Sequence, residues 1–163
     1  MGIEAENKEI ENSIRENAKM LLSEKQVDVV IGYSQGTVPL SSTPIIIRKE
    51  ENVDKLVWNN LCYINLARYL APLMSQLCDA EGKSLKIGIV AKGCVGRAVN
   101  LLAAEKQIDL ENIKMIGINC NGNVNRSKID IEIGEKEILD VSISGDDIIV
   151  KGKDWEQKFP YNE

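Results

Sequence analysis

A short strand, a glycine-bearing turn, a helix and a second short strand follow one another in the middle of the chain. This succession constrains the fold more than any other feature. Residues 85–91 (LKIGIVA) and 114–119 (KMIGIN) are apolar and β-branched, which is the pattern of buried strands. Between them, residues 97–105 place Val99 and Leu102 on one helical face. The sequence therefore predicts a βαβ unit whose two strands run parallel.

The N-terminal half supplies further elements of the same kind. Residues 7–24 form an amphipathic pattern that predicts a helix, and residues 27–33 (VDVVIGY) predict a buried strand. Residues 44–48 predict a second strand that begins at a proline. We expect a short helix at 53–58 and a longer, mostly buried helix at 61–78 that ends before Gly82.

The pattern changes after residue 125. Ile129, Ile131 and Ile133 alternate with polar residues, and later apolar residues repeat this alternation. Alternation of this kind is typical of an antiparallel meander with one wet face. The predicted fold class is therefore α/β, with a small parallel βαβ-based sheet flanked by helices and a C-terminal antiparallel β meander. We predict a single domain, residues 1–163, made of an α/β part (1–124) and a β appendix (125–163).

Charge and composition exclude several classes of partner and mechanism. The net charge is −5, and aromatic residues make up only 4 % of the chain, which argues against nucleic-acid binding. No apolar run reaches the roughly 20 residues of a membrane span, and the acidic N-terminus is unlike a secretory signal. We expect a cytoplasmic protein whose four cysteines are reduced, metal-bound or catalytic rather than disulfide-bonded. The absence of histidine excludes a Ser–His or Cys–His pair within the chain.

Three loops follow the predicted parallel strands. Ligands of open parallel sheets bind outside the carboxyl ends of the strands. The loops are residues 34–37, 92–97 and 120–123. If the βαβ strands are neighbours, Cys94 and Cys120 follow adjacent strand ends and come within reach of one metal.

The 92–97 loop (KGCVGR) also opens a helix. Backbone N–H groups at a helix start favour an anion, and Gly93 and Gly96 permit close approach to the backbone. Lys92 and Arg97 add positive charge, so a cofactor phosphate would fit there. The alternative is a plain strand-to-helix turn with surface charges, because two glycines form no Walker or Rossmann fingerprint.

The cysteines are widely spaced. Cys62, Cys94 and Cys120 contain no C-x-x-C pair, so the chain holds no self-contained ferredoxin motif. They could share a metal only by converging in space. Cys78 follows an apolar run and has no evident role.

Four segments together resemble the coenzyme F-420 hydrogenase/dehydrogenase β-subunit family. Their order and spacing match over nearly the whole chain, although Val95 and Asn119 stand where the family usually has aspartate and proline. The chain also ends before the cysteine-rich part of longer members, so that half is either lost or supplied by another polypeptide. The segments are residues 27–40 (VDVVIGYSQGTVPL), 55–70 (KLVWNNLCYINLARYL), 86–97 (KIGIVAKGCVGR) and 115–122 (MIGINCNG).

This resemblance implies a redox role. The family carries FAD and [4Fe–4S] clusters and passes electrons between the clusters of a partner and a two-electron carrier. Cys62, Cys94 and Cys120 fall on its motif cysteines, which leaves one cluster ligand to a partner chain or a non-cysteine group. The implied cofactor-binding residues are Lys92, Gly93, Gly96, Arg97, Gly36, Asn121 and Gly122.

The expected function is an electron-transfer subunit of a multi-subunit anaerobic oxidoreductase. Its expected partners are the other iron–sulfur or flavin subunits of that complex. Two alternatives stay open at this point. The chain could be a cofactor-free structural or assembly subunit, or a regulator that binds a nucleotide or another small anion at residues 92–97.

Overall fold

The computed structural model describes residues 2–76 and 84–160. A four-stranded sheet forms the centre of this part of the chain, in the order β2-β1-β3-β4. Its strands are β1 (Val29–Gln35), β2 (Ser42–Ile47), β3 (Ile87–Ala91) and β4 (Ile113–Gly117). β1, β3 and β4 run parallel, and β2 returns antiparallel to β1 at one edge.

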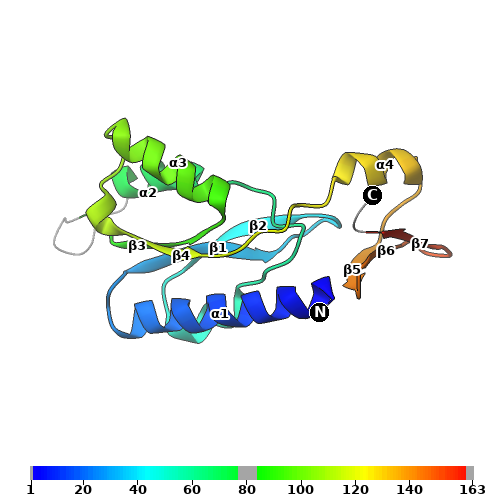
Figure 1. Cartoon of the computed structure of the whole chain (residues 1–163), viewed down its shortest axis with the longest axis horizontal. Helices are drawn as coiled ribbons and strands as arrows, with labels where there is room; N and C mark the ends of the chain where they lie inside the picture. The colour runs from blue at the N-terminus through cyan, green and yellow to red at the C-terminus, as the bar shows by residue number, and fades with distance from the viewer. Residues whose placement is uncertain (1, 77–83, 161–163) are drawn as a thin grey trace.

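Helices cover both faces of this sheet. Figure 1 shows α1 (Ile3–Ser23) along one face and α2 (Leu70–Gln76) with α3 (Gly93–Ala104) along the other. α1 buries Ile14, Ala18 and Leu21, which recur at helical spacing and face the sheet. Because both faces are covered, β3 is buried at every position from Ile87 to Ala91.

The segment between β2 and α2 differs from the helices predicted there. In place of the helix predicted at residues 53–58, the structure has a 3-10 helix, η1 (Glu50–Lys55), which begins and ends three residues earlier. The predicted 61–78 helix begins only at η2 (Leu66–Tyr69) and continues as α2. Asn65 accepts a hydrogen bond from the Ala67 N–H and starts the helix there, so residues 61–65 are loop. Cys78 and Gly82 lie outside the described residues.

The C-terminal part contains a three-stranded antiparallel sheet among the described residues, with order β5-β6-β7. Its strands are β5 (Asp140–Ser144), β6 (Asp147–Lys151) and β7 (Glu156–Pro160). A short 3-10 helix, η3 (Leu110–Asn112), precedes β4 in the first sheet. The predicted fold class is confirmed: a mixed α/β unit followed by an antiparallel meander.

The strand predicted at residues 129–133 was wrong, because this segment is helix α4 (Arg126–Ile133). Ile129 and Ile133 are buried four residues apart on one helical face, whereas Ile131 is 80 % exposed. The side chain of Asn125 accepts a hydrogen bond from the Lys128 N–H at the helix start, and Gly134 ends the helix with φ 66°. The isoleucine alternation therefore marks a half-buried helix.

The C-terminal sheet is tied to the start of α1. The Ile3 N–H donates to Asp146 Oδ1 at 3.1 Å, and the Glu4 N–H donates to the Gly145 carbonyl at 3.4 Å. In return the Gly145 N–H donates to Glu4 Oε2 at 3.3 Å. The β5–β6 turn thus satisfies backbone groups that Gly2, the N-cap residue, leaves open. None of the helices in residues 2–76 and 84–160 is long and apolar enough to cross a membrane.

Candidate functional site

The three predicted loops leave the same edge of the sheet. β1, β3 and β4 are parallel neighbours, so their carboxyl ends lie together. Ala91 pairs with Gly117, and the Ile118 N–H donates to the Ala91 carbonyl at 3.0 Å. Cys94 lies three residues after Ala91, and Cys120 lies three residues after Gly117. This confirms that the two cysteines follow adjacent strand ends.

The start of α3 presents backbone to this edge. Lys92 is its N-cap residue, and no described side chain caps the helix. The Gly96 N–H donates to the Lys92 carbonyl, so the N–H groups of residues 93–95 have no partner within the helix. These N–H groups can meet an anion or a polar group from outside.

Gly93 and Gly96 leave open space at the same place. A Cβ built on either residue would meet nothing within 4 Å, and neither has a positive φ. Glycine inside a helix costs about 1 kcal/mol relative to alanine. Since the described residues give no steric reason for glycine at either position, we read these positions as leaving room for a close external group.

Lys92 lies beneath the loop rather than on its surface. Its side chain is 1 % exposed, and its ammonium donates to the carbonyl of Cys62. The Nζ atom lies 5.5 Å from the ring centroid of Tyr33. Arg97, in contrast, is exposed. The two predicted anion-binding cations therefore differ, since one is accessible and one is part of the core.

Cys62 is a core residue in this structure. Its thiol is fully buried, 3.7 Å from Asn59 Oδ1 and 4.0 Å from the Val57 carbonyl. Burial raises the pKa of this thiol to about 11, although hydrogen bonds from Asn59 and Ser42 and the charge of Lys92 oppose the rise. At neutral pH the Cys62 thiol is protonated.

Tyr33 packs against the segment that carries Cys62. Its hydroxyl donates to the Ile64 carbonyl at 2.6 Å, and its ring packs against Trp58 with centroids 6.0 Å apart. Burial raises the pKa of the Tyr33 phenol strongly, and negative charge on Cys62, Cys94 and Cys120 raises it further. Tyr33 therefore keeps its proton at neutral pH and packs against the segment that follows Cys62.

The three cysteines nevertheless occupy different environments. Cys94 is exposed, Cys120 is half-buried and Cys62 is buried. Within the described ranges, no group of three His, Cys, Asp or Glu side chains is placed to hold a metal ion. The edge carries one exposed and one half-buried thiol, which do not complete a metal site among the described residues. A ligand role for Cys62 stays a prediction.

The loop that carries Cys120 is fixed to α1 through Asn60. The Asn7 amide donates to Asn60 Oδ1 at 2.7 Å, and the Asn60 amide donates to the Gly122 carbonyl at 3.2 Å. The Asn121 amide donates to Glu6 Oε1 at 2.7 Å. Gly122 has φ 110°, a conformation that favours glycine. The loop is therefore held in one conformation beside the sheet edge.

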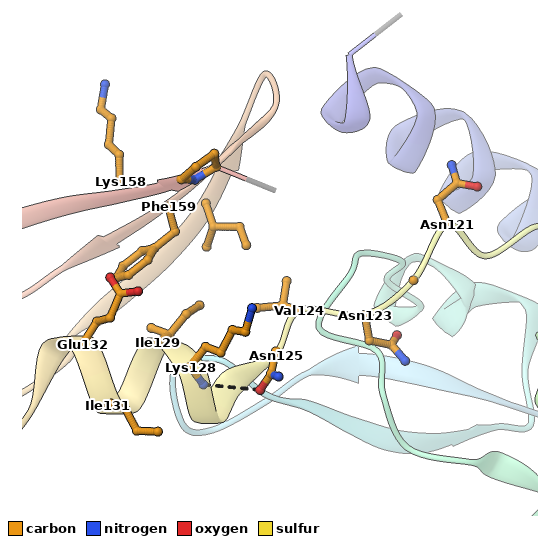
Figure 2. A pocket seen from close by; sticks show the side chains of 13 residues that line it. Asn121, Asn123, Val124, Asn125, Lys128, Ile129, Ile131, Glu132, Lys158 and Phe159 are labelled. Carbon is orange, nitrogen blue, oxygen red and sulfur yellow. Dashed lines mark hydrogen bonds between the residues drawn. The ribbon is translucent and has the colours of Figure 1, made fainter. Parts of the chain in front are cut away.

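A cleft of about 780 Å³ opens beyond this loop, between α4 and the C-terminal sheet. Figure 2 shows Asn121 and Asn123 at one side, with Ile129, Glu132 and Phe159 further along. Asn121 and Gly122 were predicted site residues, and both line this cleft. Lys128, Ile129 and Phe159 also line the cleft and were not predicted. The spacing of Ile129 and Ile133 could have indicated that Ile129 faces inward, but no local pattern indicates Lys128 or Phe159.

Gly36 has a structural reason to be glycine. A Cβ at this position would collide with the backbone and side chain of Ser41 in the loop after β1. Gly36 also lines a small hollow of about 130 Å³ together with residues 139–141. Its predicted cofactor contact stays a prediction.

Comparison with known proteins identifies relatives of this arrangement, although no family model matches the chain. The chain is 27 % identical over 147 residues to the F420-dependent formate dehydrogenase 1 subunit beta of Methanococcus maripaludis, covering 86 % of this chain and 36 % of the relative. It is 25 % identical over 147 residues to the F420-dependent formate dehydrogenase subunit beta of Methanocaldococcus jannaschii, covering 86 % and 37 %.

A solved structure shares the fold. A chain of the F420-reducing [NiFe] hydrogenase complex from Methanosarcina barkeri matches with a TM-score of 0.60 and 18 % identity, covering 96 % of this chain and 58 % of that one. The chain spans a little over a third of the length of the two dehydrogenase subunits. The resemblance to hydrogenase and dehydrogenase β subunits that the sequence indicated is confirmed.

Proposed function

We propose that this chain is an electron-transfer component of a multi-subunit oxidoreductase. The observation that carries the proposal is that Cys94, which is exposed, and Cys120, which is half-buried, follow adjacent strand ends beside the open helix start of Gly93 and Gly96. The relatives, two dehydrogenase β subunits and a chain of a hydrogenase complex, support the same class of function. The chain would work together with other subunits of such a complex.

In this proposal the edge holds a redox group jointly with a partner chain. Cys94 and Cys120 would ligate a [4Fe–4S] cluster, which supplies one-electron transfer when bound. Four thiolates are the usual set, so other ligands must come from Cys62, a partner or both. Cys62 could join only if the 59–62 turn moved, because its thiol is buried against the Asn59 side chain.

The start of α3 would serve an FAD phosphate. The free N–H groups of residues 93–95 and the exposed Arg97 favour an anion, and Gly93 and Gly96 allow it to approach the backbone. Asn121 and Gly122, in the loop after β4, line the cleft beside α4 and would contact the rest of the flavin.

The test is the cofactor content of the native assembly. The full chain would be purified anaerobically with the proteins that bind it, and iron, sulfide and flavin would be measured per chain. The double variant Cys94→Ser/Cys120→Ser should lose iron, and Arg97→Ala should lose flavin. Lys114→Met, on an exposed position of β4, is the matched surface control. Unchanged iron and flavin in all these variants would contradict the proposal.

A cofactor-free scaffold is the second candidate. It is favoured by the burial of Cys62 and of Val95, which stands where the resembling family usually has aspartate and packs in the core. A colourless chain in a stable complex, with every cofactor assigned to other subunits, would establish this role instead.

A further inference from the structure

The outer edge of β4, the side that faces away from β3, has no partner strand in residues 2–76 and 84–160. β4 ends the sheet order β2-β1-β3-β4, and β3 is the strand it pairs with in this part of the chain. α1 and α3 contact β4 from opposite faces of the sheet (Figure 1). The faces of β4 are therefore covered, while one row of its backbone groups is left for another strand.

Three residues direct their backbone groups to this outer edge. The Ile118 N–H donates to the Ala91 carbonyl of β3, and backbone groups of successive residues point to alternate sides of a strand. The N–H and C=O of Ile113, Met115 and Gly117 therefore point outward. No described backbone group outside the sheet bonds to these three residues. Such a row of free donors and acceptors is a template for strand addition.

The outer edge of β4 also lacks the usual protection against pairing. Exposed edges ordinarily carry proline or charge, as β2 does with Pro44 and β7 with Lys158 and Pro160. The outward residues of β4 are uncharged, and Met115 is 49 % exposed.

Gly117 adds a second sign of a close neighbour at this edge. A Cβ at Gly117 would meet nothing within 4 Å, and the residue has no positive φ. The described residues thus give no steric reason for glycine there. Glycine within a strand often marks a place where another backbone approaches closely.

We propose that the outer edge of β4 pairs antiparallel with β4 of a second copy of this chain, about a two-fold axis at Met115. In this register Met115 lies opposite Met115 of the second copy, and Ile113 lies opposite Gly117. Every outward N–H and C=O of the three residues then finds a partner, and the two sheets become one. The proposal goes beyond the proposed function.

Charge favours a second copy as the occupant. The chain carries a net charge of −5, yet β4 contains no acidic residue and only one basic residue, Lys114. In the proposed register Lys114 lies opposite Ile116 of the second copy, so no like charges face each other across the strands. The contact is thus centred on a segment free of the acidic groups that would drive two copies apart.

Antiparallel pairing also leaves the candidate redox site open. The carboxyl ends of the two β4 strands lie at opposite ends of the shared sheet, and Cys120 follows β4 by three residues. Each copy therefore keeps its own Cys94 and Cys120 loops away from those of the other. The pairing needs neither iron nor flavin, so its test is separate from the test of the proposed function.

The first measurement is sedimentation equilibrium of the full chain in reducing buffer, from about 1 to 500 µM, a range suited to a small interface. We expect a monomer–dimer equilibrium. Met115→Lys places two ammonium groups across the axis and should raise the dissociation constant by roughly tenfold or more. Ile131→Lys, the same exchange at an exposed position of α4, should leave it unchanged. A wild-type chain that is monomeric throughout, or equal dimerisation in both variants, would overturn the proposal.

Amide hydrogen exchange locates the contact and covers a variant that fails to fold. The outward amides of Met115 and Gly117 should exchange more slowly in wild type at the highest concentration than at the lowest. Equal rates in a dimer would place the contact elsewhere and overturn the proposal. Protection that is present in the monomer, or that arises only when another subunit binds, would assign this edge to a different strand and overturn it too.

Discussion

The two sheets of this molecule are built on cores of very different size. Among the described residues, 26 buried side chains form the core around the four-stranded sheet, and five form the core under α4 and the C-terminal sheet. β1 is buried at its first five positions, whereas β5 exposes every second residue. The first sheet is covered on both faces and the second on one.

This difference explains where the candidate site lies. Functional groups are held most precisely on rigid, well-packed elements. Lys92, Tyr33 and Cys62 belong to the large core, and the Cys94 and Cys120 loops leave its carboxyl edge. The smaller unit borders the site through the 121–125 loop and is held by local contacts to α1.

The largest expected effect is the difference in unfolding free energy between matched isoleucine-to-alanine changes in the two cores. Ile89→Ala removes a fully buried side chain from β3, and we expect it to lower the free energy of unfolding by about 4 kcal/mol. Ile148→Ala in β6 should cost about 2 kcal/mol, because its neighbours can collapse into the cleft. Denaturant unfolding gives both values, and amide exchange should rise only in residues 140–160 for Ile148→Ala. A global rise would show that the two cores unfold as one.

The loss of stability at alkaline pH should show that Cys62 is buried in the larger core. Burial raises the pKa of its thiol from 9.0 to about 11, so the folded chain holds this proton more tightly than the unfolded chain. The stability it contributes is present below pH 9 and lost as pH rises to about 11, a loss of about 3 kcal/mol. Burial also raises the pKa of the Tyr33 phenol, so this group too contributes stability that is lost as the pH rises further.

The measurement is the denaturation midpoint between pH 8 and 11 in three proteins. Cys62→Ala should flatten the decline relative to wild type, and Cys94→Ala, at an exposed position, should follow wild type. Equal slopes for wild type and Cys62→Ala would mean that this thiol is not buried in solution.

Breaking the contact between the C-terminal sheet and α1 should cost less free energy of unfolding than a cavity in either core. Asp146→Ala removes the carboxylate that accepts from the Ile3 N–H, and we expect it to cost about 1 kcal/mol, as for loss of a helix cap. The neighbouring Asp147→Ala is the control. Amide exchange at the start of α1 should increase with Asp146→Ala alone; protection equal to that of wild type would show that the turn does not hold the helix.

The smallest expected effect tests whether residues 126–133 form a helix or a strand. Ile131 is 80 % exposed, so Ile131→Lys should change stability by less than about 0.5 kcal/mol. Ile129→Lys, two residues earlier and buried, should destabilise the C-terminal unit strongly. Similar large losses for both changes would favour the strand that the alternation suggested.

The same contrast shows what the sequence could predict. Residues 85–91 were identifiable as a strand because burial on both faces requires a continuous apolar run. Residues 114–119 were identifiable by their apolar, β-branched pattern, although β4 buries only Ile113 and Ile116, and β3 and β4 do pair in parallel. The βαβ rule predicted that the two strands run parallel. Their adjacency was a condition of the prediction, and the structure meets it, so the Cys94 and Cys120 loops follow neighbouring strand ends. The smaller core gave an ambiguous pattern, since Ile129, Ile131 and Ile133 satisfy a strand by alternation and a helix by the spacing of four.

Other parts of the site depended on tertiary contacts. Nothing in the local sequence shows that the Lys92 side chain turns inward to the Cys62 carbonyl, because lysine at a loop position is ordinarily exposed. The burial of Cys62 follows from the turn at residues 59–62, which overlaps the start of the helix predicted at 61–78. Long-range hydrogen bonds such as Asn7 to Asn60 have no pattern along the chain.

The most direct test of the central claim is an electron-microscopy structure of the complex purified anaerobically from its own host. The account predicts density for an iron–sulfur group or a flavin at the carboxyl edge of β3 and β4, in contact with Cys94, Cys120 or the start of α3. It also predicts a partner chain that closes this edge. An edge that is filled only by protein side chains, with all cofactors bound elsewhere in the complex, would contradict the redox role and leave a scaffold subunit.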